Sequence, residues 1–255
     1  MIGDHLRGTD GASTVATRYH RTAAAMVAQA AAFGGIFVVT SDQAGVGKSL
    51  STRAAAEATG REVHVCQFTP DASIASVNAV LLDALGVRVS RADAVPETTA
   101  ELRGLLGQRP RVVVIESAHD LSGHALAHLR ILHSTAEFTL GFVGHRRFLA
   151  RASSQPELFD TADRWIRFGP LPAAEMLGCL VEYHPAFATA DPTRLAAIEA
   201  AHARGRWKRW AQFLRTGLLY AATEGDGELT PRVIDHSLLA LDWARPSAGR
   251  KGPGR

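Results

Sequence analysis

The chain has 255 residues, of which 46% are hydrophobic and 21% charged, and its formal net charge is +3. This profile is typical of a globular protein and excludes a disordered chain; no apolar stretch approaches the roughly 20 residues that a membrane-spanning helix needs. The beginning of the chain lacks the basic and apolar order of a signal peptide, so we expect a cytoplasmic protein. Two cysteines, Cys66 and Cys179, are too few for a disulfide framework or a zinc site.

The two ends of the chain are rich in Gly and polar residues. We expect residues 1–12 to be a disordered N-terminus. Residues 244–255 carry cationic side chains among Gly, Pro and Ser, with little apolar surface to bury, and predict a disordered basic tail. Such a tail can hold DNA nonspecifically or can serve only as a solubilising end, and the sequence leaves both open.

Strand-like and helical segments alternate between these ends. Short runs rich in β-branched or aromatic residues predict strands at 35–40, 62–68, 111–115 and 138–143, with a weaker fifth at 165–168. Stretches of helical period separate them at 49–59, 73–85, 98–106 and 123–134. Nearly continuous apolar strands with intervening helices indicate a parallel sheet that is buried on both faces. We therefore expect a doubly wound α/β domain, with right-handed crossovers, at residues 13–169.

After Pro170 the strand-like runs stop. Helical patterns follow at 173–183, 192–203, 207–223 and 230–241. The last one opens with Thr230 as the N-cap and Pro231 at the first helical position. We expect residues 170–243 to form a small all-helical lid domain.

A glycine-containing loop follows the first predicted strand and precedes a helix. It reads DQAGVGKS, from Asp42 to Ser49. The glycines let backbone N–H groups turn inward around a phosphate, the lysine is placed to reach the β- and γ-phosphates, and the serine hydroxyl is placed to ligate Mg²⁺. The following helix directs the positive end of its dipole at the anion. The residues expected to bind ATP are Asp42, Gln43, Ala44, Gly45, Val46, Gly47, Lys48, Ser49 and Leu50.

One position of this loop departs from the G-x-x-x-x-G-K-[ST] pattern. Asp42 stands where the pattern has its first glycine. Aspartate tolerates a left-handed backbone better than most residues, so the turn is feasible. Its carboxylate would repel a nucleotide phosphate if it pointed inward.

The third predicted strand ends in Glu116, Ser117, Ala118 and His119. In hydrolytic P-loop proteins, the corresponding strand usually ends in two acidic residues. One holds the Mg²⁺ shell, and the other polarises the attacking water. Glu116 can serve Mg²⁺ through water, whereas Ser117 is too weakly basic to act as the general base, a loss of about 10² to 10⁴ in rate. We expect His119 and Asp120 to face away. Alternatively, Glu116 only caps the helix that begins after Ser122.

His145 ends the fourth predicted strand, where many ATPases have a polar residue that senses the γ-phosphate. A structural role for this histidine is equally open. Arg146 and Arg147 follow it, and they are either a solvated basic corner or a contact for the DNA backbone.

Taken together, these motifs resemble those of AAA+ ATPases of the bacterial transposition-helper group, the TniB, TnsC and Mu B proteins, and most of all the actinobacterial type. The resemblance covers roughly residues 15–225. It rests on the order and spacing of AGVGKS, RPRVVVIESAHDLS, FTLGFVGH, DRWIRFGPLPAAEM and HARGRWKRWAQFL. It implies an AAA+ P-loop fold with a five-stranded parallel sheet and a helical lid, and it implies ATP and Mg²⁺ as cofactors.

The resemblance also implies roles for two basic residues. Arg164 matches an arginine that reaches the nucleotide of the neighbouring subunit; otherwise it is a surface arginine with a packed stem. The family has Gly-Asn-Phe-Arg at the start of a lid helix, whose arginine touches the γ-phosphate. Here the motif reads Gly205-Arg206-Trp207-Lys208, so Lys208 takes that place, with Arg209 next to it. Lysine lacks the planar fork of arginine. We expect Trp207 and Trp210 to belong to the lid core.

By this resemblance the protein assembles on double-stranded DNA as a homo-oligomer, contacts DNA phosphates, and recruits or regulates a transposase or integrase, with no membrane partner. The departures at Asp42, Glu116, Ser117 and Lys208 predict that nucleotide binding persists while hydrolysis is slow or absent. Two alternatives stay open. The chain is an active AAA+ ATPase for secretion or remodelling with a base recruited from elsewhere, or it is a nucleotide-sensing interaction module without a DNA role.

Overall fold

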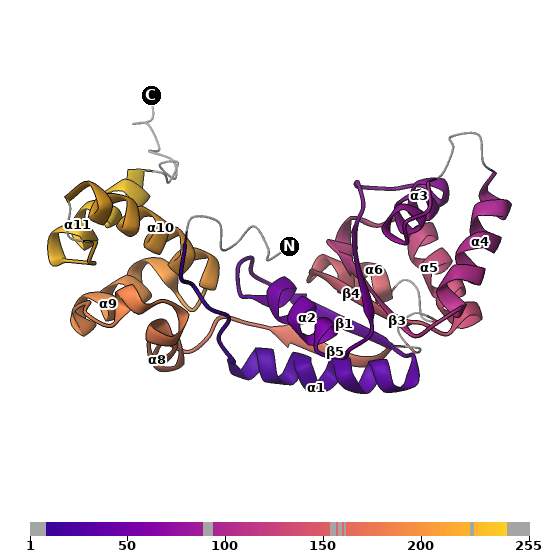
Figure 1. The fold of residues 1–255 in the computed structure, drawn as a ribbon, viewed down its shortest axis with the longest axis horizontal. Coiled ribbons are helices and arrows are strands. Elements are labelled where there is room, and N and C mark those ends of the chain that lie inside the picture. The colour runs from indigo at the N-terminus through magenta and orange to yellow at the C-terminus, as the bar shows by residue number, and fades with distance from the viewer. Residues whose placement is uncertain are drawn as a thin grey trace, which may run out of the picture. The chain divides into compact units, whose positions relative to one another are not determined.

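The computed structural model describes residues 9–88, 94–153, 157, 160, 162–224 and 227–243 (Figure 1). The expected basic tail at 244–255 and residues 1–8 of the expected loose N-terminus lie outside these residues. The described chain divides into two compact units, one at Ala16–Gly169 and a second that joins the residues up to Val15 to those from Pro170 onward. None of the helices in the described part is both long and apolar enough to cross a membrane.

The described residues of the first unit form a five-stranded sheet in the order β2-β3-β4-β1-β5, and every pairing is parallel. The expectation of a doubly wound parallel sheet is confirmed. The strands are β1 (Ile36–Ser41), β2 (Glu62–Gln67), β3 (Arg111–Glu116), β4 (Thr139–His145) and β5 (Ala162–Phe168). β5 is longer than predicted. It lies at the edge of the sheet and exposes polar residues, so it lacks the apolar run that marks a buried strand.

Helices cover both faces of this sheet. On one face, α1 (Arg18–Phe33) and α2 (Lys48–Glu57) pack on Phe37 and Val39 of β1. On the other face, Ile36 and Val38 contact the core of α3 (Ile74–Ala84), α4 (Val95–Gly107), α5 (Gly123–Ala136) and α6 (Arg147–Ser153). Figure 1 shows α3, α4 and α5 as one group. Alternate residues of β1 are therefore buried on opposite sides, as a central strand requires.

The second unit consists of helices, as predicted. They are α8 (Ala173–Tyr183), a 3₁₀ turn at Pro185–Phe187, α9 (Pro192–Ile198), α10 (Trp207–Glu224) and α11 (Pro231–Trp243). The predicted helix at 192–203 changes at Glu199 into a π-helical turn that ends at Ala203. Thr230 caps α11 as expected, since its Oγ1 accepts a hydrogen bond of 3.3 Å from the N–H of Val233.

The end of the segment expected to be loose is packed against this second unit. Thr9 is buried. The N–H of Ser13 donates to the carbonyl of Tyr183 at 2.8 Å, and the ring Nε2 of His184 lies 2.8 Å from the carbonyl oxygen of Asp10. Hydrogen bonds to the backbone of this segment, which its polar composition does not reveal, therefore hold residues 9–13 in place.

Aromatic residues form the core of the second unit. Trp210 is fully buried, with its ring in edge contact with Phe187 at 5.5 Å and Phe213 at 5.8 Å between centroids. The Trp207 ring lies 5.1 Å from that of Tyr183. The expectation that both tryptophans belong to the core of this unit is confirmed for Trp210, whereas Trp207 is half-buried and packs against Tyr183 at its margin. Neither is a free platform for stacking bases.

A buried carboxylate fixes the turn between the π-helical segment and α10. Glu199 accepts hydrogen bonds from the N–H of Gly205 at 2.5 Å and from the indole N–H of Trp210 at 2.8 Å. Gly205 has a φ of 71°, and a Cβ there would lie 2.3 Å from the carbonyl oxygen of Leu171. The turn therefore needs both the glycine and the glutamate.

Glu199→Ala is expected to lower the free energy of unfolding of the second unit by about 2 to 5 kcal/mol, because it leaves two buried N–H donors without an acceptor. Urea unfolding followed by tryptophan fluorescence measures this loss. Glu182→Ala, at an exposed position of α8, is the matched control and should change stability by less than about 0.5 kcal/mol. Equal stability of the two variants would contradict the role given to Glu199.

Candidate nucleotide-binding site

The loop Asp42–Gly47 connects β1 to α2. Gly45 and Gly47 have φ values of 79° and 92°, a left-handed region that favours glycine. Gly47 is also the N-cap residue of α2, and no side chain caps that helix, so the N–H groups of its first turn are available to an anion. The buried side chain of Val46 anchors the loop. This backbone has the form that a phosphate group requires.

Lys48 and Ser49 begin α2. Burial lowers the pKa of the Lys48 ammonium, and the nearby Glu116 carboxylate opposes this shift. Within the described part of the chain no carboxylate forms an ion pair with Lys48. A partly desolvated cation at the mouth of an amide-lined loop is suited to bind a phosphate.

Ser49 also links α2 to the end of β3. Its hydroxyl donates a hydrogen bond of 2.8 Å to Oε2 of Glu116. The described residues contain no group of three or more His, Cys, Asp and Glu side chains that could hold a metal alone. Mg²⁺ commonly keeps water and phosphate oxygens as ligands, so a hydroxyl beside one carboxylate fits such an ion.

The alternative that Glu116 only caps the next helix is wrong. Ser122 caps α5 itself, with its Oγ accepting from the N–H of Ala125 at 3.2 Å. The Glu116 carboxylate instead accepts the hydrogen bond from Ser49, a residue in the first turn of α2.

Ser117 follows Glu116 in an unusual backbone conformation. Its φ is 53°, and it opens the 3₁₀ turn Ala118–Asp120. This left-handed residue turns the chain back on itself directly after the strand. Ser117 places a hydroxyl group next to Glu116, at the position where a hydrolytic P-loop protein would have a carboxylate as its general base.

His119 lies closer to the site than expected, because of this turn. The backbone N–H of His145 makes a long hydrogen bond of 3.4 Å to Nδ1 of His119, and the two rings are 6.1 Å apart. Burial lowers the pKa of His119, an effect that Asp120 opposes and that His145 and Lys48 reinforce. The ring is therefore neutral near pH 7. The expectation that His119 faces away is wrong.

The end of β1 lies between residues of the two neighbouring strands. Ser41 pairs with His145 of β4 on one side and with Phe168 of β5 on the other. Carboxyl ends of parallel strands meet at one edge of a sheet, where ligands commonly bind. Nε2 of His145 lies 2.9 Å from the carbonyl oxygen of Asp42, to which it can donate a hydrogen bond. This histidine holds the backbone of the loop.

Arg167 lies on β5, which flanks β1 on the side away from β4, and contacts the side chain of Asp42. Its guanidinium donates to the Asp42 carboxylate, and this contact holds the pKa of the carboxyl below its usual value. Arg167 is not among the site residues that the sequence predicts. The signal available in the sequence was its place one residue before the end of the weak fifth strand, and the structure adds that it pairs in register with Thr40 of β1.

Arg164 lies elsewhere on the same strand. It pairs in register with Phe37, in the amino-terminal half of β5, so the chain's own phosphate loop at the other end of β1 is not its neighbour. Its Nε donates to Oε1 of Gln29 and one terminal nitrogen donates to the carbonyl of Asp163, each at 2.7 Å. Its guanidinium is exposed.

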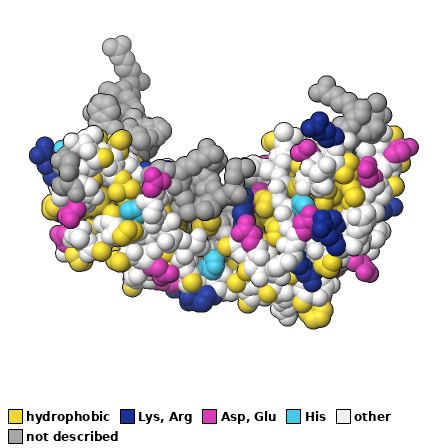
Figure 2. Space-filling model, in the orientation of Figure 1, with side chains coloured by type: hydrophobic (Ala, Val, Ile, Leu, Met, Phe, Trp, Pro, Cys, Tyr) yellow, Lys and Arg dark blue, Asp and Glu magenta, His cyan; other side chains and the backbone are white. Residues whose placement is uncertain are grey.

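The basic residues of the remaining motifs also have defined places. Lys208 is exposed in the first turn of α10, and Arg209 donates to the carbonyl of His202 at 2.9 Å. Arg146, between β4 and α6, and Arg147, the first residue of α6, are both exposed. Charge is not gathered in one field on the face drawn in Figure 2, where Lys and Arg side chains lie in small groups among Asp and Glu.

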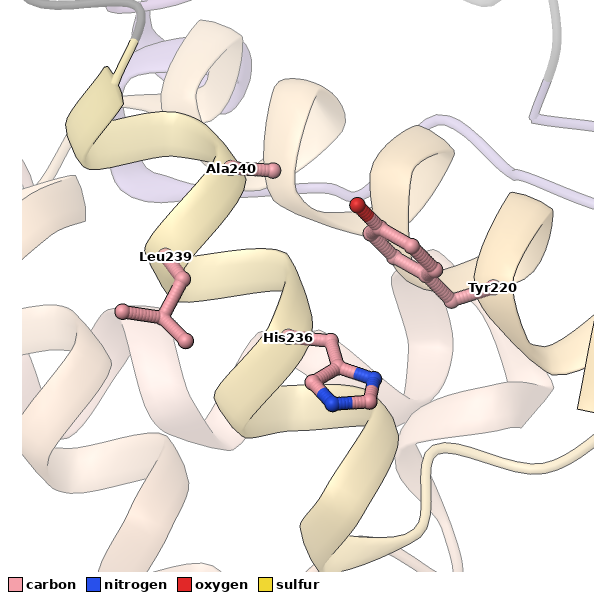
Figure 3. Close-up of a pocket in the computed structure, with 4 residues that line it drawn as sticks. All are labelled: Tyr220, His236, Leu239 and Ala240. Carbon is pink, nitrogen blue, oxygen red and sulfur yellow. The ribbon is translucent and has the colours of Figure 1, made fainter.

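The helical unit has a shallow pocket of its own. It measures about 380 Å³ and is lined by Tyr220 of α10 with His236, Leu239 and Ala240 of α11 (Figure 3). The rings of Tyr220 and His236 are 5.8 Å apart. None of the residues expected to bind nucleotide lines this pocket.

Comparisons with known proteins agree with this geometry. The protein family described as AAA domain matches residues 34–151. No curated protein matches the chain in sequence. Among solved structures, Cdc6p from Pyrobaculum aerophilum has a TM-score of 0.75 at 14% identity, covering 94% of this chain and 71% of that one.

Two Aeropyrum pernix proteins are also similar. The ORC2 protein, in ADPNP–ADP complexes, has a TM-score of 0.72 at 13% identity and covers 91% of this chain and 70% of that one. The ORC1 protein, in complex with DNA, has a TM-score of 0.66 at 15% identity and covers 88% and 65%. These likenesses establish the fold. The chain has the AAA+ P-loop NTPase fold, with an AAA domain at residues 34–151.

Proposed function

We propose that this AAA+ chain binds ATP with Mg²⁺ at the loop Asp42–Ser49, hydrolyses it slowly or not at all, and uses bound ATP to assemble on double-stranded DNA. The observation that supports this most is the link between Ser49 and Glu116, next to the hydroxyl of Ser117. Residues suited to hold a nucleotide and a metal therefore lie together in this loop and at the end of β3. The carboxylate that would activate water is replaced.

Each residue of the site has a defined task in this proposal. The amides around Gly45 and Gly47 and the ammonium of Lys48 bind the phosphates. Ser49 and Glu116 would hold Mg²⁺, directly or through water, and the bound ion would offset negative charge of the triphosphate. His145 positions the loop through the Asp42 carbonyl and is also the candidate sensor of the γ-phosphate. Ser117 leaves the attacking water without a base.

Assembly would depend on a second copy of the chain. Arg164 is exposed, and its place in the half of β5 away from the phosphate loop suits it to reach the nucleotide of a neighbouring subunit. The resemblance assigns Lys208, in the expected helical domain at 170–243, to the γ-phosphate of the nucleotide, and it places the nucleotide-binding domain at 13–169. ATP would then act as a bridge between copies of the chain.

The DNA and transposase roles rest on the resemblance to the transposition-helper group. The similar ORC1 structure is of a complex with DNA, and the similar ORC2 structure contains ADPNP and ADP. Binding through DNA phosphates would be nonspecific in sequence and sensitive to salt. A transposase or integrase would be recruited to the assembled protein.

Sedimentation tests the assembly. With ATP, Mg²⁺ and a duplex of about 60 base pairs, we expect large complexes. These complexes should dissociate as the salt concentration rises from about 50 to 200 mM. Omission of either ATP or DNA should leave small species. A monomer under every condition would contradict the proposal.

The second candidate is an active ATPase that powers another process. The observation in its favour is the neutral ring of His119 close to His145, which offers a base outside the usual position. However, its Nδ1 accepts from the His145 N–H, so Nε2 holds the proton and no lone pair faces solvent. A nucleotide-sensing module without a DNA role would bind ATP and ignore the duplex in the sedimentation test.

A further inference from the structure

The first position of the phosphate loop is held from both sides. His145 of β4 contacts the backbone carbonyl of Asp42, and Arg167 of β5 contacts its carboxylate. Ser41, the last residue of β1, adds a hydrogen bond of 2.8 Å from its hydroxyl to the carbonyl of Gln43. Both the direction of the loop and the direction of the Asp42 side chain are therefore fixed.

We propose that Arg167 is a positioning residue that pairs with Asp42 and keeps its carboxylate away from the nucleotide phosphates. A loop with aspartate in place of its first glycine can then still bind a triphosphate. This inference rests on the proposed nucleotide site. It adds the contact that allows aspartate to replace the first glycine of the loop.

The charges around Asp42 support this role. Ionised at neutral pH, its carboxylate would stand at the entrance of a site that has to admit several negative charges. Arg167 cancels that charge directly, while Arg146 and His145 favour the ionised carboxylate from a greater distance. Of these groups, Arg167 has the largest effect in lowering the pKa of the Asp42 carboxyl.

The ion pair between Arg167 and Asp42 is expected to affect nucleotide binding more than the stability of the fold. The side chain of Arg167 is 66% exposed and that of Asp42 is 36% exposed. Ion pairs at this exposure contribute little to stability, because water screens them. Removal of Arg167 should therefore leave the fold intact and release the carboxylate.

The effect of that release depends on the charge of the ligand. In Arg167→Ala, we expect ATP affinity to fall about tenfold. This is the size of the repulsion between one unpaired carboxylate and a phosphate a few ångströms away, at a dielectric constant between those of protein and water. ADP affinity should fall less, and adenosine affinity should not change. A merely structural role for Arg167 would weaken all three ligands equally.

A double-mutant cycle provides the decisive control. Asp42→Gly restores the pattern glycine and should bind ATP at least as tightly as the natural chain. Adding Arg167→Ala to Asp42→Gly should have no further effect, since the carboxylate is absent. Arg167→Lys should keep most of the affinity. Arg88→Ala, at an exposed position after α3, should change nothing.

Fluorescent-nucleotide titration and melting curves for these variants test the inference. Unchanged ATP affinity in Arg167→Ala, an equal loss for adenosine, or an Arg167→Ala loss that persists in Asp42→Gly would each overturn it. Failure of the proposed site looks different. The natural chain would then bind no ATP, or Lys48→Ala would bind it equally well.

Discussion

Replacing Ser117 by glutamate is expected to raise steady-state phosphate release by about 10²- to 10⁴-fold, the usual contribution of a general base. The substitution adds a carboxylate directly after Glu116, at the carboxyl end of β3. The left-handed backbone at this position is already adopted by Ser117, so a longer side chain adds little strain. ATP affinity should change far less than turnover.

Ser117→Gln is the matched control for this gain. It has the length and polarity of glutamate but cannot accept a proton near neutral pH, so its turnover should remain that of the natural chain. Phosphate release under saturating ATP and Mg²⁺, with and without duplex DNA, measures all three proteins. A glutamine variant as fast as the glutamate variant would show that base chemistry is not what the site lacks.

Lys48→Ala is expected to weaken ATP binding by about a hundredfold, because it removes the charge-assisted hydrogen bonds that a partly buried ammonium makes to phosphate. Assembly on DNA should be lost with it. The melting temperature without nucleotide should stay the same or rise, because the variant no longer pays for a desolvated cation.

Arg103→Ala, an exposed substitution on α4, is the control for a change in net charge and should bind ATP as the natural chain does. Isothermal titration calorimetry gives both affinities. If Lys48→Ala retained full ATP affinity, the loop Asp42–Ser49 would not be the phosphate site.

Most of the sheet could be predicted because its central strands are nearly continuous apolar runs between helical segments. The phosphate loop was recognisable because glycines, lysine and serine occur at fixed spacing. α1 was missed although the sequence carries its signals, since Thr17 caps it, Gly34 ends it with a φ of 66°, and its buried residues from Ala23 to Ala31 recur at helical spacing. The edge strand β5 was underestimated because three of its seven residues are charged, and these interrupt the apolar run that marks a strand.

The contacts that complete the site could not be read from spacing. Arg167 and Asp42 are far apart in the chain, and only the order β4-β1-β5 brings them together. His119 reaches His145 only because Ser117 adopts a left-handed conformation, which its residue type does not predict. Motifs identify the groups within one loop, whereas pairs across strands depend on topology and register.

The most direct test of this account is the chemical state of nucleotide that stays bound. The natural protein is incubated for several minutes with ATP and Mg²⁺, separated from free nucleotide, and denatured, and the released nucleotide is identified by chromatography. We expect intact ATP in nearly stoichiometric amount. Recovery of ADP would identify an active hydrolase, and recovery of no nucleotide would contradict binding at this loop.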